Sequence, residues 1–130
     1  MSQSLATVAL IVADYDDAIS FYCDSLGFDL IADNALDAGK RWIVVAPPGR
    51  SGAQLLLAKA EGDAQLAAVG NQGGGRVMFF LETNNFPKDH AAMLGAGVIF
   101  LEEPRHEVYG TVAVFQDLYG NKWDLIQPKR

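Results

Sequence analysis

The sequence predicts an α+β fold built from two βαβββ modules, because one pattern of residues occurs twice along the chain. Residues 7–28 run from an apolar, strand-like stretch through an acidic break and an amphipathic helix to a glycine and an apolar residue, and residues 78–98 repeat this order. Each half then continues with extended segments and a glycine before its final strand, at Gly52 and Gly120. A chain of two such modules is expected to form one concave site between them.

Composition indicates one globular domain spanning residues 1–130. Half of the residues are hydrophobic, and no apolar run approaches the roughly 20 residues that a membrane-spanning helix needs. The first residues lack the features of a secretory signal, so we expect a cytoplasmic protein with no membrane partner. The net charge of −6 argues against a nucleic-acid partner, since phosphate binding needs clustered Lys and Arg.

The first module, about residues 5–60, opens with an apolar strand that begins at Thr7. Asp14 is a good helix N-cap, and the apolar stripe after it predicts a helix that ends at Gly27. Cys23 lies inside this helix, which favours a packed small side chain over a nucleophile. The remaining elements are a loop at 34–40 and β-rich segments at 28–31, 41–46 and 54–58.

Small and polar residues at about 61–75 predict a linker before the second module, about residues 76–128. This module begins with a strand at 77–83, and Pro87 suits the first turn of a helix that runs to about Leu94. The remaining elements are strands at 98–101, 111–115 and 122–126, a polar loop at 102–110 and a turn at 117–121.

Three motifs carry a resemblance to a known superfamily: residues 8–22, residues 26–28 and residues 117–125. Together they resemble the vicinal oxygen chelate superfamily, which contains glyoxalase I, extradiol dioxygenases, fosfomycin-resistance proteins and bleomycin-resistance binding proteins. The resemblance covers nearly the whole chain. It implies mixed sheets curled around a cup between the modules, and a homodimer.

In metal-dependent members of that superfamily, His and Glu side chains on the first and last strand of each module hold a divalent ion. The equivalent positions here are Thr7, Leu56, Met78 and Asp124, of which only Asp124 binds cations well. One carboxylate does not hold a transition metal that normally takes three or four ligands. We therefore expect no metal and no cofactor.

Alternation along the strands predicts which side chains face the cup. Leu10 and Val12 are expected to pack beneath the first helix, which turns Thr7 toward the cup, and the same parity turns Phe80 and Glu82 inward. The ligand-binding candidates are Thr7, Trp42, Gln54, Leu56, Met78, Phe80, Glu82, Tyr109 and Asp124. Carboxylates beside aromatic walls suit a flat or cationic organic ligand.

Three functions stay open at this point. The first is a metal-free protein that binds a small organic molecule, similar to the bleomycin-resistance type, and the missing metal ligands favour it over an enzyme. The second is a metal-dependent lyase or dioxygenase with a divergent site built from Asp124, Glu82 and His106. The third is a non-catalytic structural dimer with an occluded cup. His90 is expected at the surface of the second helix, and His106 in a solvated loop that could overhang the cup.

Overall fold

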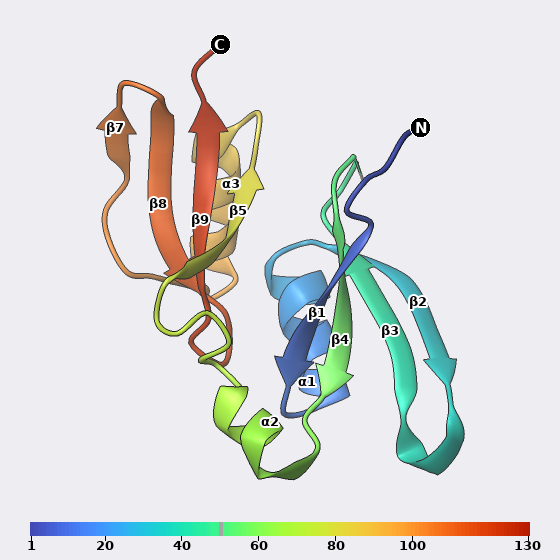
Figure 1. The fold of residues 1–130 in the computed structure, drawn as a ribbon. Helices are drawn as coiled ribbons and strands as arrows, with labels where there is room; N and C mark the ends of the chain where they lie inside the picture. The colour runs from blue at the N-terminus through green and yellow to red at the C-terminus, as the bar shows by residue number, and fades with distance from the viewer. Residues whose placement is uncertain (50) are drawn as a thin grey trace. The chain divides into compact units, whose positions relative to one another are not determined.

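The computed structural model describes residues 1–49 and 51–130, which form two compact units, Met1–Val69 and Gly70–Arg130 (Figure 1). Each unit contains one sheet, and the first and last strands of that sheet run parallel to each other. The predicted α+β class and its two βαβββ modules are confirmed. The expected cup between the modules stays a prediction. Within the described residues, no helix is long and apolar enough to span a membrane.

The first unit has the strand order β1-β4-β3-β2, with β1 parallel to β4 and the other neighbours antiparallel. Its strands are β1 (Thr7–Val12), β2 (Asp29–Ala35), β3 (Arg41–Ala46) and β4 (Gln54–Lys59). Helix α1 (Tyr15–Ile19) continues into the π-helical turn η1 (Ser20–Ser25), and a 3-10 turn η2 (Asp37–Gly39) joins β2 to β3. Strand β1 therefore forms one edge of this sheet.

The predicted capping and packing of the first helix are confirmed. The Asp17 backbone N–H donates to Asp14 Oδ2 at 2.9 Å, which satisfies one of the free donors at the helix start. Leu10, Val12 and Tyr22 are completely buried, so one face of the sheet and the helix form a shared apolar core. Burial raises the pKa of the Cys23 thiol, with smaller contributions from nearby carboxylates, which fits a packed side chain better than a nucleophile.

Two elements of the first unit differ from the prediction. Strand β2 runs on to Ala35 because it pairs with β3 along its length, across a bulge between Leu30 and Ala32. Helix α2 (Gly62–Ala68) occupies part of the segment expected to be a linker. None of its residues is buried, so it lacks the apolar stripe that marks a packed helix in a sequence.

The second unit has the strand order β5-β9-β8-β6, and the short strand β7 pairs with β8. Its elements are β5 (Val77–Glu82), α3 (Phe86–Gly95), β6 (Ile99–Phe100), β7 (Arg105–Glu107), β8 (Gly110–Gln116) and β9 (Lys122–Pro128). Helix α3 packs against β9 and lies behind the strands in Figure 1. Strand β7 falls within the segment expected to be a loop.

Aromatic rings fill the space between the second sheet and α3. Trp123 and Phe115 are paired across β9 and β8, and their rings are stacked with centroids 5.8 Å apart. Phe79 contacts the Trp123 ring at 4.7 Å, and Leu125 is buried on the same face. As predicted, Pro87 lies in the first turn of α3, which Asn85 caps by accepting from the Lys88 backbone N–H at 3.2 Å.

The turn between β8 and β9 is fixed by a buried carboxylate. Asp117 Oδ1 accepts from the backbone N–H groups of Tyr119 and Asn121, and Oδ2 accepts from the Asn121 side chain, each at 2.9 Å. Gly120 takes a φ of 97°, which favours glycine. Because this turn sets the register of β9 against β8, it also decides which β9 side chains point away from the helix.

Candidate functional site

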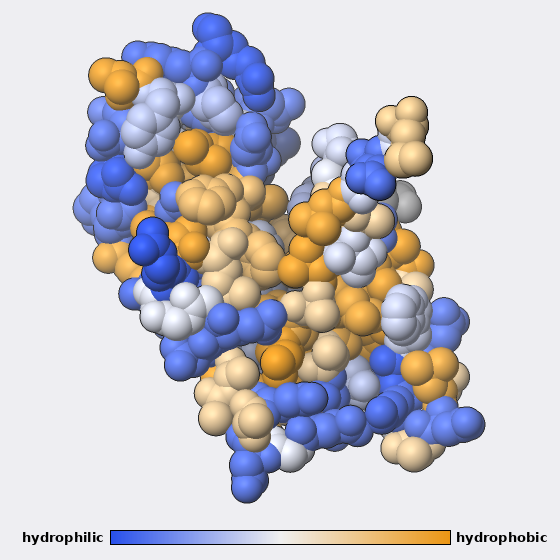
Figure 2. Space-filling view, in the orientation of Figure 1, coloured by the Kyte–Doolittle hydropathy of each residue, from blue (hydrophilic) through white to orange (hydrophobic). Residues whose placement is uncertain are grey.

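The second sheet has an open face, which we define as the side turned away from α3. Strand pairing places Phe80 of β5, Asp124 of β9 and Val114 of β8 in one row across this face. Phe80 is 65% exposed, a large fraction for an aromatic side chain in a sheet. Figure 2 shows hydrophobic surface over the strands of this unit with hydrophilic residues around it. The row on the open face therefore combines two apolar side chains with one carboxylate.

Asp124 is the polar group at the centre of that row. Its Oδ1 atom is buried and has no hydrogen-bond partner among the described residues. Burial raises the pKa of this carboxyl, the positive charge of Arg105 opposes the rise, and Glu102 adds to it. A buried acceptor without a partner is costly, so this oxygen is suited to accept a hydrogen bond from a bound molecule.

An ion-pair cluster borders the row on the β7 side. Arg105 Nε donates to both carboxylate oxygens of Glu102, at 3.0 and 3.1 Å, and Arg105 Nη1 lies 3.5 Å from Glu107 Oε1. Glu102 Oε2 also accepts from the Val114 backbone N–H at 3.0 Å, which ties the cluster to the row. The hydrogen bonds of Arg105 to Glu102, with a smaller contribution from Tyr109, raise the pKa of the Arg105 guanidinium.

Sequence reasoning missed Glu102 and Arg105 as site residues because it predicted a loop at 102–110. Arg105 lies on the open face because it is paired with Val112 of β8. A pairing of this kind is not visible in the local sequence. The predicted candidate Tyr109 lies in the turn between β7 and β8, is 51% exposed, and contacts the cluster through Arg105.

The other two candidates of the second unit are placed differently. The Glu82 carboxylate lies on the open face but is 3.7 Å from Arg130 Nη2, in an exposed ion pair. Met78 lies at a β-bulge, where the pairing register with β9 shifts. Its side chain packs so closely over Gly73 that a Cβ atom there would meet it. Phe80 and Asp124 are thus the candidates that the structure brings together.

The four candidates of the first unit share the open face of the first sheet, the side turned away from α1. Thr7 is paired with Gln54, and Leu56 is paired with Val44. Trp42 precedes Val44 by two residues, so it lies on the same face, where it is 46% exposed. Trp42 and Leu56 line a hollow of about 470 Å³ within this unit.

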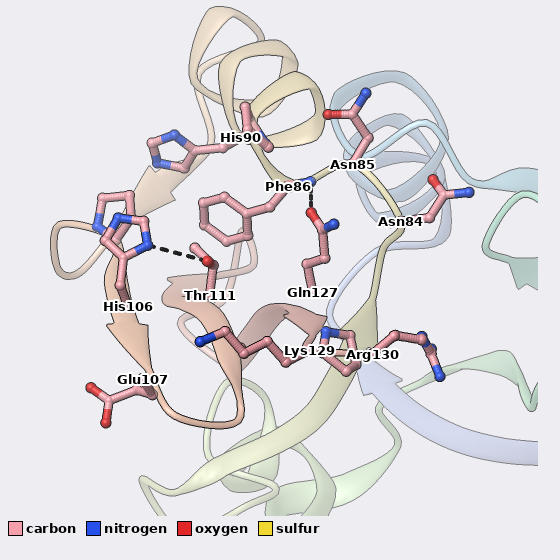
Figure 3. A pocket seen from close by; sticks show the side chains of 14 residues that line it. Asn84, Asn85, Phe86, His90, His106, Glu107, Thr111, Gln127, Lys129 and Arg130 are labelled. Atoms are coloured by element: carbon pink, nitrogen blue, oxygen red, sulfur yellow. Dashed lines mark hydrogen bonds between the residues drawn. The ribbon is translucent and has the colours of Figure 1, made fainter.

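The two histidines have different surroundings. His106 belongs to β7 and is paired with Thr111, so it points to the helix side of the sheet, with Nδ1 3.2 Å from Thr111 Oγ1 (Figure 3). The divergent set of Asp124, Glu82 and His106 is not assembled. Asp124 and Glu82 lie on the open face, whereas His106 points to the helix side. His106 is exposed, as expected, but it belongs to a short strand rather than to a loop.

His90 lies on α3, as expected, and is half-buried rather than fully exposed. Its ring is stacked on Phe86, with centroids 5.4 Å apart, and meets the Phe100 ring edge-on at 4.5 Å. The helical spacing of Phe86 and His90 brings the two rings onto one face of α3, so this histidine is half-buried in an aromatic group.

The residues at the family's metal-ligand positions do not fit a divalent transition metal. Thr7 provides a hydroxyl, Leu56 provides no donor, Met78 provides a thioether, and Asp124 provides one carboxylate. Within residues 1–49 and 51–130, no group of three or more His, Cys, Asp and Glu side chains lies close enough to hold a metal ion. No step of a reaction is therefore assigned to a metal here.

Comparison with known proteins agrees with this architecture. A family model described as the Glyoxalase/Bleomycin resistance protein/Dioxygenase superfamily matches residues 4–125. The chain is 52% identical over 128 residues to an uncharacterized protein of Shewanella frigidimarina (strain NCIMB 400), a match that covers 98% of this chain and 95% of that protein.

Two solved structures are similar over nearly their whole length. UcmS2 has a TM-score of 0.84 at 28% identity, covering 97% of this chain and 98% of that one. TnmS3, an antibiotic binding protein from Streptomyces sp. CB03234, has a TM-score of 0.77 at 29% identity, covering 99% of this chain and 98% of that one. From the family match and the shared fold, the chain belongs to the glyoxalase/bleomycin resistance protein/dioxygenase superfamily.

Proposed function

We propose that this protein binds a small organic molecule on its open sheet faces and does not transform it. One observation carries the proposal: the exposed ring of Phe80 lies beside Asp124, which has a buried oxygen without a partner among the described residues. An aromatic contact contributes roughly 0.5–1.5 kcal/mol beyond burial. An unsatisfied buried acceptor costs about 1–3 kcal/mol, so a ligand with a donor beside its ring would gain from both groups.

The chemistry of this face selects among ligands. Asp124, Glu82 and the Glu102 carboxylate are acceptors, and Arg105 is already engaged with Glu102 and Glu107. A flat molecule with a cationic or N–H group therefore matches the face better than an anion does. Trp42 and Leu56 in the first unit, together with Thr7 and Gln54 beside them, are proposed as further ligand contacts.

Two observations support binding over catalysis. The residues at the metal-ligand positions lack the donors that the metal-dependent enzymes of the family need. TnmS3, which shares the fold at 29% identity, is an antibiotic binding protein. We therefore propose sequestration of a small molecule of an antibiotic kind as the biological role. A cytoplasmic location, expected from the sequence, stays a prediction.

A thermal-shift screen of planar cationic and polar aromatic compounds tests the proposal. We expect hits whose shifts are mostly lost in Phe80→Ala and in Asp124→Asn while both variants stay folded, since Phe80 is exposed and contributes little to the core. Matched controls are Leu94→Ala, an exposed apolar residue of α3, and Glu103→Gln, an exposed acidic residue. Both controls should keep the shifts. Full binding in the two site variants would place the site elsewhere, and a screen without hits would favour the structural role.

The metal-free part of the proposal has its own measurement. We expect elemental analysis of protein purified without chelator to find far less than one zinc, nickel or iron per chain. The reason is that Asp124 is a lone carboxylate donor among the family's ligand positions. About one metal ion per chain, lost in Asp124→Ala, would contradict the proposal and favour an enzyme.

We also propose that the protein is a homodimer, as its family resemblance implies. Strands β1 and β5 each form an edge of their sheet, and an open apolar edge favours pairing with another strand. Light scattering at micromolar concentration should give twice the chain mass of 14.0 kDa. A mass equal to that of one chain would rule the dimer out under these conditions.

A further inference from the structure

The second unit contains a hollow of about 860 Å³ on the helix side of its sheet, opposite the open face (Figure 3). We call it the helix-side hollow. Phe86, His90, His106, Gln127 and Lys129 are among the residues that line it. None of the nine ligand candidates lines this hollow. Its volume lies within the range of small-molecule sites, roughly 300–1,000 Å³.

The charges around the helix-side hollow run against those of the chain. The chain has 16 acidic and 10 basic residues, whereas Lys129, Arg130 and one carboxylate, Glu107, line the hollow. Glu107 Oε1 lies 3.5 Å from Arg105 Nη1, and Arg130 Nη2 lies 3.7 Å from Glu82 Oε1, so both of these charges are already matched. Lys129 has no ion-pair partner among the described residues. The local charge therefore favours an anion.

Hydrogen bonds within the hollow leave a donor group of Gln127 for a ligand. Gln127 Oε1 accepts from the Phe86 backbone N–H at 2.7 Å, which fixes the amide group and leaves its NH₂ as a donor. His106 uses Nδ1 in its contact with Thr111 Oγ1, which leaves Nε2 for another partner. Figure 3 shows the Phe86 ring pointing into the space between His106 and Gln127.

Apolar and aromatic groups complete the walls. Phe86 is stacked with His90, and Pro87, Pro104 and Pro128 also line the hollow. We propose that the helix-side hollow is a second binding site, for a small organic anion in which a carboxylate is joined to a flat apolar group. Lys129, Gln127 and His106 contact the carboxylate, while the aromatic and proline walls contact the ring. This site is separate from the open face and does not depend on the function proposed for it.

An NMR titration of the full chain with naphthalene-2-carboxylate tests the site, because amide signals report where a probe binds. We expect saturable shifts at Phe86, Thr111 and Lys129, and binding of naphthalene-2-carboxamide at least about threefold weaker, since it lacks the charge. Shifts confined to the row of Phe80 and Asp124, equal affinity for both probes, or no saturable shift at millimolar probe would each overturn the proposal.

Variants separate this site from the open face. Lys129→Gln should weaken carboxylate binding by about three- to fivefold, the upper range for an exposed charge pair, and adding His106→Gln should weaken it further. Lys88→Gln is the matched control, an exposed lysine of α3 that does not line the hollow. Asp124→Asn should leave carboxylate binding unchanged. An equal loss in Lys88→Gln, or a loss in Asp124→Asn, would contradict the assignment.

Discussion

Replacing Asp124 with asparagine should stabilise the folded protein while it removes ligand binding. Asp124 is partly buried, and its Oδ1 atom has no partner among the described residues. Burial raises the pKa of the carboxyl above its usual value of 3.8, which means that the fold disfavours the charged form. The neutral amide of asparagine has nearly the same shape without this desolvation cost.

The size of the gain follows from the surroundings of the carboxylate. Arg105 partly offsets the cost of burying the charge, and the side chain is not fully buried, so the whole cost of a buried charge does not apply. We expect the free energy of unfolding of Asp124→Asn at pH 7 to exceed that of the wild type by up to about 1 kcal/mol. The control Glu103→Gln, at an exposed carboxylate, should change it by less than about 0.5 kcal/mol.

The pH dependence gives the sign of the effect independently. A carboxyl with a raised pKa in the folded state contributes stability below its unfolded pKa, and this contribution is lost as the pH rises through the folded pKa. The advantage of Asp124→Asn should therefore be absent near pH 3.5 and should grow as the pH rises above 3.8 to its full size at pH 7. Urea unfolding at several pH values measures it.

A loss of more than about 1 kcal/mol in Asp124→Asn at pH 7 would refute this reasoning. It would mean that the carboxylate is paired in the folded protein and supports the structure. In that case Asp124 would not be held ready for a ligand, and the open-face proposal would lose the observation on which it depends.

Two further substitutions test the parts of the fold that position the site. Asp117→Ala removes the carboxylate that accepts from the backbone N–H groups of Tyr119 and Asn121. Urea unfolding should therefore show that the free energy of unfolding falls by at least about 2 kcal/mol, and a fall of less than about 0.5 kcal/mol would show the turn to be dispensable. Gly110 has a φ of 151°, and Gly110→Ala would place a Cβ atom against the Gln127 carbonyl oxygen. We expect the free energy of unfolding to fall by about 2 kcal/mol or more. Wild-type stability would argue against this close approach of β8 to β9.

Local rules were sufficient for much of the fold. The cap at Asp14 and the proline in the first turn of the second helix could be predicted because each acts on residues within four positions along the chain. Period-two alternation predicted that Phe80 points away from the helix, and the glycine before the last strand fixed the parity of Asp124. The strand pairing places both on one face.

Other features depend on contacts between distant residues. The pairing of Arg105 with Val112 and of His106 with Thr111 decides which of the two neighbours reaches the open face. A segment of three paired residues carries too short an alternation to be recognised as a strand. The bulge at Met78 likewise breaks the alternation on which its prediction depended.

The two proposed sites of the second unit follow from the alternation of a single strand. Asp124 and Ile126 of β9 point to the open face, whereas Leu125 and Gln127 point to the helix side. The open face thereby receives a carboxylate acceptor, and the helix side receives a fixed amide donor with Lys129 close by in the chain. One face therefore favours donors and cations, and the other favours anions. A shift of β9 by one residue would exchange the two chemistries. The buried Asp117 turn that fixes this register therefore also determines which side chains each proposed site presents to a ligand.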